Sequence, residues 1–226
     1  MTNVDREAPL PPEIEIALAY LPENKRRRVA SLFELDAHLG SLVARAREPT
    51  IGLLRLTWWR DALAALDGGS VPPEPLLLAL SQSGLPGAAL ADLTEGWEVL
   101  LDDPDLTDAT IAWHAERRGA ALFALAGGLL GSRDADAQRL AGAGAGWALT
   151  DLARHLSTRD RVVAVLSAAR PPLDRAMATR WPNALRPLGM LAVLAREDAR
   201  RGHEALRPPA SRGRLLRLLA HRWTGR

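Results

Sequence analysis

The stretch from residue 31 to residue 63 constrains the fold most, because it describes two amphipathic helices separated by one proline. Its sequence is SLFELDAHLGSLVARAREPTIGLLRLTWWRDAL. Apolar residues recur at helical spacing through Val29, Leu39 and Val43. Glu48-Pro49 interrupts this pattern, since proline is disfavoured inside a helix and accepted in its first turn. The pattern predicts two consecutive helices, at about 23–47 and 50–66.

The remainder of the chain is also predicted to be helical, without strands. Ala, Leu and Arg dominate and favour helices, whereas the sequence holds only one Tyr and two Phe. We find no internal repeat and no inter-domain linker, so we expect a single all-α domain over residues 1–226. Proline, glycine and capping residues place the other helices at about 12–20, 75–82, 87–101, 107–130, 134–156, 160–169, 182–206 and 211–223.

Charge, cysteine content and hydrophobicity indicate which sites the chain can form and where in the cell we expect it. The chain has no cysteine, which excludes disulfides and thiolate metal sites. The segment from Arg207 to Arg226 carries six Arg and no acid, so the other residues sum to about −4 (the net +2 minus 6). The start, MTNVDREAPLPP, shows no signal peptide, and the apolar stretch 119–132 is too short for a membrane span. We expect a cytoplasmic protein, peripheral on the inner membrane in one interpretation.

Two segments resemble motifs of a known family. Trp58 to Leu63 reads WWRDAL and matches a Trp-Arg-x-x-Leu helix, while Leu149, Thr150 and Arg154 match a Leu-Thr-Asn-Ile-Leu-Arg-Asp helix. A weaker likeness covers residues 117–131. These segments, in this order, resemble the squalene/phytoene synthase family. The resemblance implies an isoprenoid-synthase-like bundle of about nine or ten helices around a central cavity.

The same alignment shows what the chain lacks. The aspartates of the first family motif fall on Gly40, Ser41 and Ala44. The metal-binding aspartate of the second motif falls on His155, and the next acidic positions fall on residues 157–159, Ser-Thr-Arg. In the family, two such clusters hold magnesium on the pyrophosphates of two prenyl diphosphates that are joined head to head. Gly, Ser, Ala and His cannot supply the hard oxygen ligands that magnesium requires, so no metal site is expected.

Three functions stay open at this point. The leading hypothesis is a family member that is degenerate in catalysis and acts as a binding or assembly protein near a membrane; one family branch without the aspartates is an assembly factor for respiratory complex I. The first alternative is an active, magnesium-dependent prenyl-diphosphate transferase, in which other acids, or those of a second subunit, replace the clusters. The second alternative is a carrier of a prenyl diphosphate or another apolar ligand.

Asp36 is the first candidate site residue. It falls in the middle of the apolar stripe of its helix, between Phe33 and Gly40, and a buried carboxylate requires a partner or an elevated pKa. The resemblance places Arg154 on the facing helix, so an Asp36–Arg154 ion pair is predicted. The other interpretation makes both residues the polar, substrate-binding lining of a ligand cavity.

Asp151 and His155 are the remaining catalytic candidates. They lie four residues apart on one helix face, which also carries Trp147 as a substrate-binding candidate. Two ligands without a third make a weak metal site, and an ordinary i,i+4 contact explains them equally well. The glycines of residues 142–146 follow no strand, so they indicate close helix packing rather than a dinucleotide site.

The Arg-rich C-terminal helix at 211–223 is the candidate partner surface. Its leucines and Trp223 alternate with arginines at helical spacing. Its apolar face either completes the globule or contacts a membrane surface or a membrane-complex partner. Nothing else in the sequence indicates nucleic-acid binding.

Overall fold

The computed structural model describes residues 10–69, 71–103, 105–202, 208 and 210–226, and these are helical without any strand. Short helical turns join α5 to α6 through η2 and α7 to α8 through η3, so the twelve α segments of the described residues form ten continuous helices. The predicted all-α fold is confirmed. The elements are α1 (Pro12–Ala19), α2 (Glu23–Arg45), α3 (Pro49–Ala64), η1 (Ala65–Gly68), α4 (Pro75–Ser81), α5 (Gly87–Ala91), η2 (Asp92–Thr94), α6 (Glu95–Asp102), α7 (Asp108–His114), η3 (Ala115–Ala120), α8 (Ala121–Leu130), η4 (Asp134–Asp136), α9 (Ala137–His155), α10 (Arg159–Ala176), η5 (Asn183–Leu185), α11 (Arg186–Arg201) and α12 (Arg212–Thr224).

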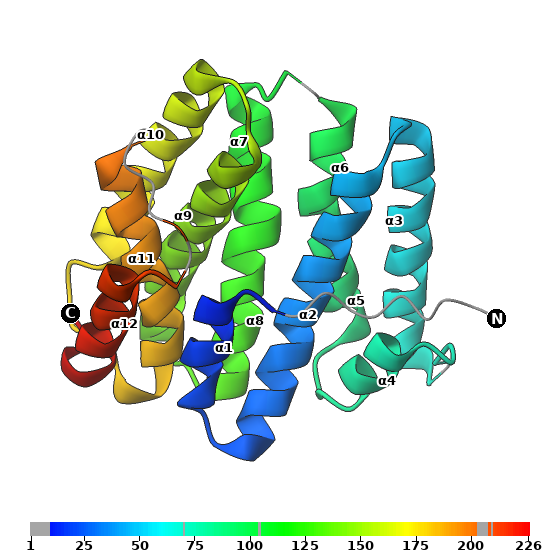
Figure 1. Cartoon of the computed structure of the whole chain (residues 1–226). Coiled ribbons are helices and arrows are strands. Elements are labelled where there is room, and N and C mark those ends of the chain that lie inside the picture. Colours follow the sequence, from blue (N-terminus) through cyan, green and yellow to red (C-terminus); the bar gives the residue numbers. More distant parts are fainter. Residues whose placement is uncertain (1–9, 70, 104, 203–207, 209) are drawn as a thin grey trace.

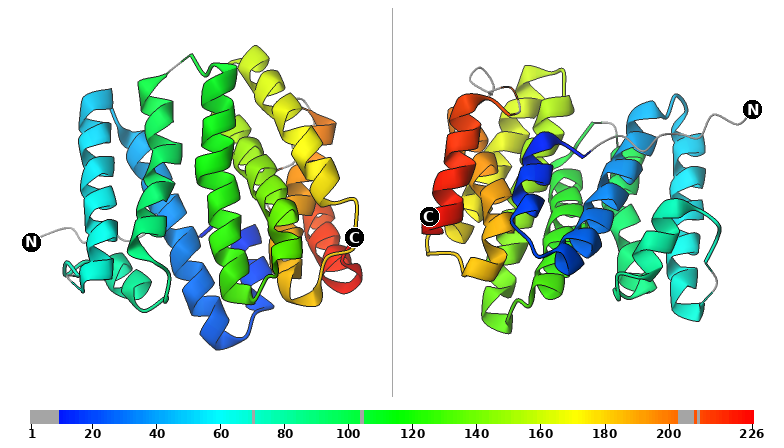
Figure 2. Two further views of the ribbon diagram at one scale, coloured as in Figure 1. Left: turned by 180° about the vertical axis from the view of Figure 1, so that it is seen from behind. Right: turned by 60° about the horizontal axis from the view of Figure 1, so that its bottom comes forward.

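The continuous run α7–η3–α8 forms the centre of the bundle (Figure 1). The helices α2 and α6 pack on one side of this run and α9 on the other. The views from behind and from below show α3 and α12 at opposite edges of the molecule (Figure 2). Leu35 of α2, Phe123 of α8 and Leu149 of α9 contribute to one continuous buried core. The central run is therefore placed to carry side chains between α2 and α9.

The bounds of this central run follow from residues at its two ends. The Thr107 hydroxyl accepts a hydrogen bond from the Thr110 amide and caps α7. Gly131, at φ +86°, adopts the left-handed conformation that ends α8. These ends confirm the helix predicted at 107–130. The sequence did not predict η3, a single π-helical turn in the middle of the run.

Close approach between the central run and α9 depends on glycine. A Cβ atom added to Gly144 would lie 2.0 Å from the carbonyl oxygen of Gly119, and one added to Gly119 would lie 2.2 Å from that of Gly144. No larger residue fits either position, so the two backbones touch at this point. The prediction that the glycines of 142–146 allow close packing is confirmed.

The predicted end of the helix at 160–169 is wrong. Pro171 and Pro172 lie inside α10, which continues to Ala176. Leu173 is fully buried, and a Cβ on Gly146 would lie 2.2 Å from its Cγ, so this turn packs directly on α9. Packing of the turn outweighs the loss of two backbone donors. The helix predicted at 182–206 begins with η5, and the α11 segment ends at Arg201, with Gly202 as its C-cap; residues 203–207 lie outside the described residues.

The C-terminal helix α12 is attached to the bundle. It packs along α11, with Leu218 completely buried and the polar side chains of Arg214 and His221 also buried. Other apolar side chains of the helix stay exposed: Leu216 is 68% and Trp223 78% accessible. The prediction that this helix helps to complete the globule is therefore confirmed by Leu218, while contact of its exposed side with a membrane or a partner stays a prediction. Among the described residues, no helix has the length and apolar character to cross a membrane.

Candidate functional site

A buried arginine joins the two acidic candidates of the sequence. Arg118 lies on η3 and is 3% exposed, between Asp36 of α2 and Asp151 of α9. Its Nε and one terminal nitrogen donate to the two Asp36 oxygens at 2.8 and 2.9 Å. The same terminal nitrogen donates to Asp151 Oδ2 at 2.7 Å. One cation thus binds carboxylates from two opposing helices, and its contact with Asp36 is the strong, bidentate form of an ion pair.

Aromatic rings enclose the guanidinium. The ring centre of Trp97, on α6, lies 4.0 Å from the Arg118 guanidinium carbon, and that of Trp147, on α9, lies 5.0 Å away. The Trp97 indole N–H also donates to Asp36 Oδ1 at 3.2 Å. Cation–π contacts of this kind strengthen when the cation is removed from water. We name the set Asp36, Trp97, Arg118, Trp147 and Asp151 the central ion cluster.

Local backbone geometry explains why Arg118 reaches this position. A π-helical turn inserts an extra residue into the helix and changes the direction in which its side chains point. A Cβ on Gly96 would lie 2.5 Å from the Arg118 backbone nitrogen, so α6 touches η3 directly. Gly119, the next residue, makes the equally close contact with α9. Glycines on both sides therefore bring α6 and α9 close to the arginine.

Electrostatics keep the cluster charged despite its burial. Burial by itself would raise the pKa of Asp151, but the charge and the hydrogen bond of Arg118, together with other nearby groups, outweigh burial and lower the pKa. Burial likewise opposes the charge of Arg118, whose pKa is nevertheless raised by Asp36 and Asp151. His114, one turn before Arg118, is bound through Nδ1 to the Gly96 carbonyl at 2.6 Å. Burial, together with the Arg118 charge, lowers the pKa of His114 to about 3, so its ring is neutral.

The predicted Asp36–Arg154 pair is wrong. Arg154 instead donates to Asp198 Oδ2 on α11 at 2.7 Å. Arg214 of α12 donates to Asp198 Oδ1 at 2.5 Å and to the two oxygens of Glu13 on α1 at 2.5 and 2.8 Å. Asp36 and Arg154 therefore belong to two separate groups of charges. We name Glu13, Arg154, Asp198 and Arg214 the tail ion cluster, because it connects α12 to three other helices.

His155 lies at the edge of the cluster rather than inside it. Its Nδ1 is 2.9 Å from the backbone oxygen of Asp151, and the residue is exposed. The structure thus shows the i,i+4 contact between these candidates, but through the backbone. Trp147 faces Arg118 and packs edge-on against Phe33. Within the described part of the chain, no three His, Asp or Glu side chains gather closely enough to bind a metal.

The three positions that align with the family's first aspartate motif provide no metal ligand. A Cβ on Gly40 would lie 2.7 Å from the Trp97 ring, so that ring covers the residue. The Ser41 hydroxyl donates to the backbone oxygen of His38, and Ala44 is exposed. Since Asp36 and Asp151 already bind Arg118, these residues do not fit a magnesium ion, which takes oxygen ligands and would be repelled by the guanidinium.

Two hollows among the described residues lie elsewhere. One, of about 490 Å³, is lined mainly by alanines of α7, α9 and α10, together with Asp108 and Leu149. The other, of about 410 Å³, lies between α11 and α12 and is lined mainly by arginines. Neither contains a residue of the central ion cluster.

Comparison with known proteins agrees with this architecture. The family described as squalene/phytoene synthase matches residues 13–222. The chain belongs to the squalene/phytoene synthase family. Its structure resembles a crystal structure of a dehydrosqualene synthase in complex with ligand, with a TM-score of 0.73 and 16% sequence identity over 94% of this chain and 90% of that one. At this identity the likeness shows the isoprenoid-synthase fold. No curated protein sequence matches the chain.

Proposed function

We propose that this chain does not condense prenyl diphosphates and acts instead as a binding or assembly protein at a membrane surface. The absence of condensation activity is inferred from the position of Arg118 between Asp36 and Asp151. The two acids lie on opposing helices, as the family's metal-binding acids do, but both already bind a permanent cation, which balances one of their two negative charges. Arginine stays protonated at any physiological pH, so a change of pH does not remove this cation from the two acids.

Energetics favour Arg118 over a metal. Removing the guanidinium would leave Asp36 buried without a cation, at a cost of about 3–5 kcal/mol. A magnesium ion could recover this only with further oxygen ligands, and the neighbouring side chains are the rings of Trp97 and Trp147. Two engaged carboxylates and two aromatic walls therefore support a structural role for the cluster. The leaving pyrophosphate would find no magnesium to stabilise it.

A pyrophosphate-release assay tests the catalytic half of the proposal. Purified protein, magnesium and farnesyl or geranylgeranyl diphosphate are combined, and release is followed beside a working dehydrosqualene synthase as a positive control. We expect no release above the rate without protein. Magnesium-dependent release that Asp36→Asn abolishes would refute the proposal, because it would assign catalysis to this cluster. Release that Asp36→Asn leaves unchanged would refute it equally, with the active acids elsewhere.

The outer side of α12 supports the membrane half. Leu216, Leu219 and Trp223 form an exposed apolar strip, spaced three and four residues apart. Arg212 lies in line with this strip, and Arg217 and Arg222 flank it. An amphipathic helix of this type lies in the membrane interface with its apolar side buried among lipids, and its arginines favour anionic headgroups.

Co-sedimentation with vesicles tests this half. Deleting α12 is not informative, because Arg214 and Leu218 are buried and their loss would disturb the fold. The double variant Leu216→Ser/Trp223→Ser changes only exposed side chains, and we expect it to lose most binding to vesicles that contain phosphatidylserine. The matched control is Leu54→Ser/Trp58→Ser on α3, which removes a similarly exposed pair at the opposite edge (Figure 2). Equal loss in both variants, or in neither, would contradict a specific role for α12.

A further inference from the structure

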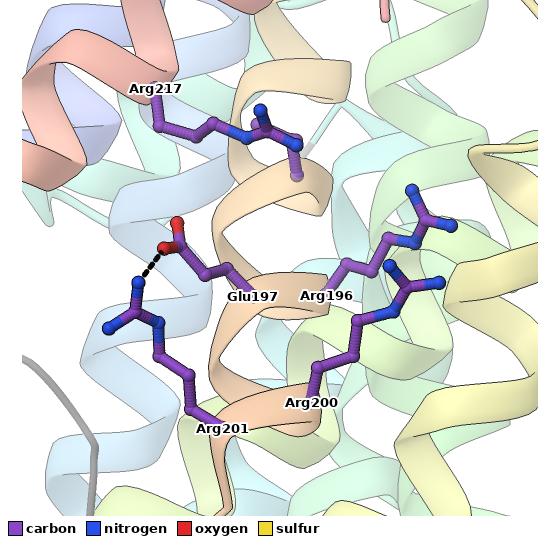
Figure 3. A pocket seen from close by; sticks show the side chains of 6 residues that line it. Arg196, Glu197, Arg200, Arg201 and Arg217 are labelled. Atoms are coloured by element: carbon purple, nitrogen blue, oxygen red, sulfur yellow. Dashed lines mark hydrogen bonds and ion pairs between the residues drawn. The ribbon is translucent and has the colours of Figure 1, made fainter.

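Figure 3 shows the arginine-lined hollow between α11 and α12. None of its lining residues belongs to either ion cluster. Its volume is about 410 Å³. Figure 3 shows the guanidinium groups of Arg196 and Arg200 side by side on α11, and Arg217 reaching over that helix from α12. The lining residues are Val193, Arg196, Glu197, Arg200, Arg201 and Arg217.

The charges around the hollow do not balance. Asp174 of α10 accepts from both Arg196 and Arg200, at 2.6 and 2.8 Å. Glu197 pairs with Arg201 on its own helix. Arg217 makes no ion pair with any described residue. Four arginines thus face two acids, which leaves two positive charges in excess among the described residues.

We propose that this hollow binds a phosphate group. The surplus of two charges matches a phosphate that carries two negative charges, and arginine donates to phosphate oxygens in a planar, bidentate fork. Arg217 and Arg200 are the groups with donors to offer. Arg217 pairs with no acid of the described residues, and the Arg200 side chain is 55% exposed with one terminal nitrogen bound to Asp174. Val193 is a buried lining residue and gives the hollow one apolar wall.

The phosphate could belong to a free anion or to a lipid headgroup, and the shared chemistry is an oxyanion with two charges. Inorganic phosphate probes the hollow without any membrane, so this proposal does not depend on the exposed strip of α12. A short-chain, water-soluble phosphatidic acid adds the glycerol and acyl carbons of a lipid. Tighter binding of the phosphatidic acid than of inorganic phosphate would identify a headgroup site, whereas equal binding would identify a site for a free anion.

Titration calorimetry of the full-length protein at low salt tests the proposal. The key variants are Arg217→Gln and Arg200→Gln, which remove exposed guanidinium groups, and the matched control is Arg212→Gln on the same helix, outside the hollow. We expect saturable binding of inorganic phosphate, weakened about tenfold or more by either key variant and less than twofold by the control. Circular dichroism verifies that each variant is folded. Absence of saturable binding, or equal weakening by Arg212→Gln, would overturn the proposal.

Discussion

The central and tail ion clusters share one arrangement of charges but lie in different parts of the fold. Each places one buried arginine between carboxylates of two other helices: Arg118 binds Asp36 and Asp151, and Arg214 binds Glu13 and Asp198. In the central cluster the arginine lies between the helices that correspond to the family's two acidic motifs. In the tail cluster it attaches the last helix to the first. Arg214 thus connects α12 to the bundle, whereas Arg118 binds the two acids at its centre.

The two clusters also differ in charge and surroundings. The central cluster has two carboxylates and one guanidinium, under two tryptophan rings and beside neutral His114. The four named side chains of the tail cluster are two acids and two arginines, so each Asp198 oxygen receives a different arginine. The central cluster therefore has no second cation to compensate for the loss of the first. The tail cluster has a second cation, Arg154. Substituting the arginine of the central cluster is therefore expected to cost more stability than substituting that of the tail cluster.

Substituting Arg118 should have the largest effect on stability. Arg118→Met leaves Asp36 buried without a cation, and we expect the free energy of unfolding to fall by about 3–5 kcal/mol. Arg118→Lys should recover only part of this, because an ammonium cannot bind Asp36 through a bidentate fork. Urea unfolding at pH 7 measures both. The neighbouring Arg117, half exposed and paired with Glu95, is the control, and Arg117→Met should cost less than about 1 kcal/mol. A loss for Arg118→Met no greater than that of the control would show that the ion pairs of Arg118 contribute little to the stability of the fold.

Substituting Arg214 should have a smaller and more local effect. In Arg214→Met, Asp198 keeps its bond to Arg154, so we expect a loss of about 2 kcal/mol. Glu13 loses its ion pair, and α12 loses its connection to α1. Amide hydrogen exchange should accelerate in α12 and stay unchanged in η3. Arg217→Met, on the exposed side of the same helix, is the control and should leave exchange unaltered. Acceleration throughout the bundle would mean that the two clusters are not independent.

The sequence predicted the fold well because helix periodicity, proline and glycine act locally. Thr107 and Gly131 define one helix in the sequence and in the structure. The prediction failed at Pro171 and Pro172, where packing of Leu173 on α9 stabilises a turn that local preference disfavours. Such packing depends on Gly146, which is 27 residues earlier in the chain than Leu173, and no local rule can detect it.

The site was predicted only in part, for a similar reason. The position of Asp36 in an apolar stripe correctly indicated a buried carboxylate that needs a partner. Its actual partner, Arg118, lies on the π-helical turn, whose extra residue a regular 100° helical periodicity does not include. One signal was available: Arg118-Gly119 lies in the segment of weaker family likeness, and a glycine in a helix often marks close backbone contact. The tail ion cluster joins residues up to 201 positions apart, so its pairing has no local signature.

Lowering the pH to mildly acidic values should have the smallest of these effects on the free energy of unfolding, and the effect should differ between the two clusters. His114 has a folded pKa of about 3 and an ordinary value of 6.5, so between these values the unfolded chain binds a proton that the folded chain does not. Stability therefore falls as pH decreases, by about 1 kcal/mol between pH 7 and pH 5.5. His221, whose burial lowers its pKa to about 4, adds a similar amount. The lowered pKa of Glu13 makes the tail cluster lose stability only as pH falls below about 4.5, outside this window.

His114→Asn, which keeps a donor for the Gly96 carbonyl, should remove about half of the loss seen in urea unfolding at the two pH values. An unchanged pH dependence in this variant would mean that His114 is not held neutral beside Arg118.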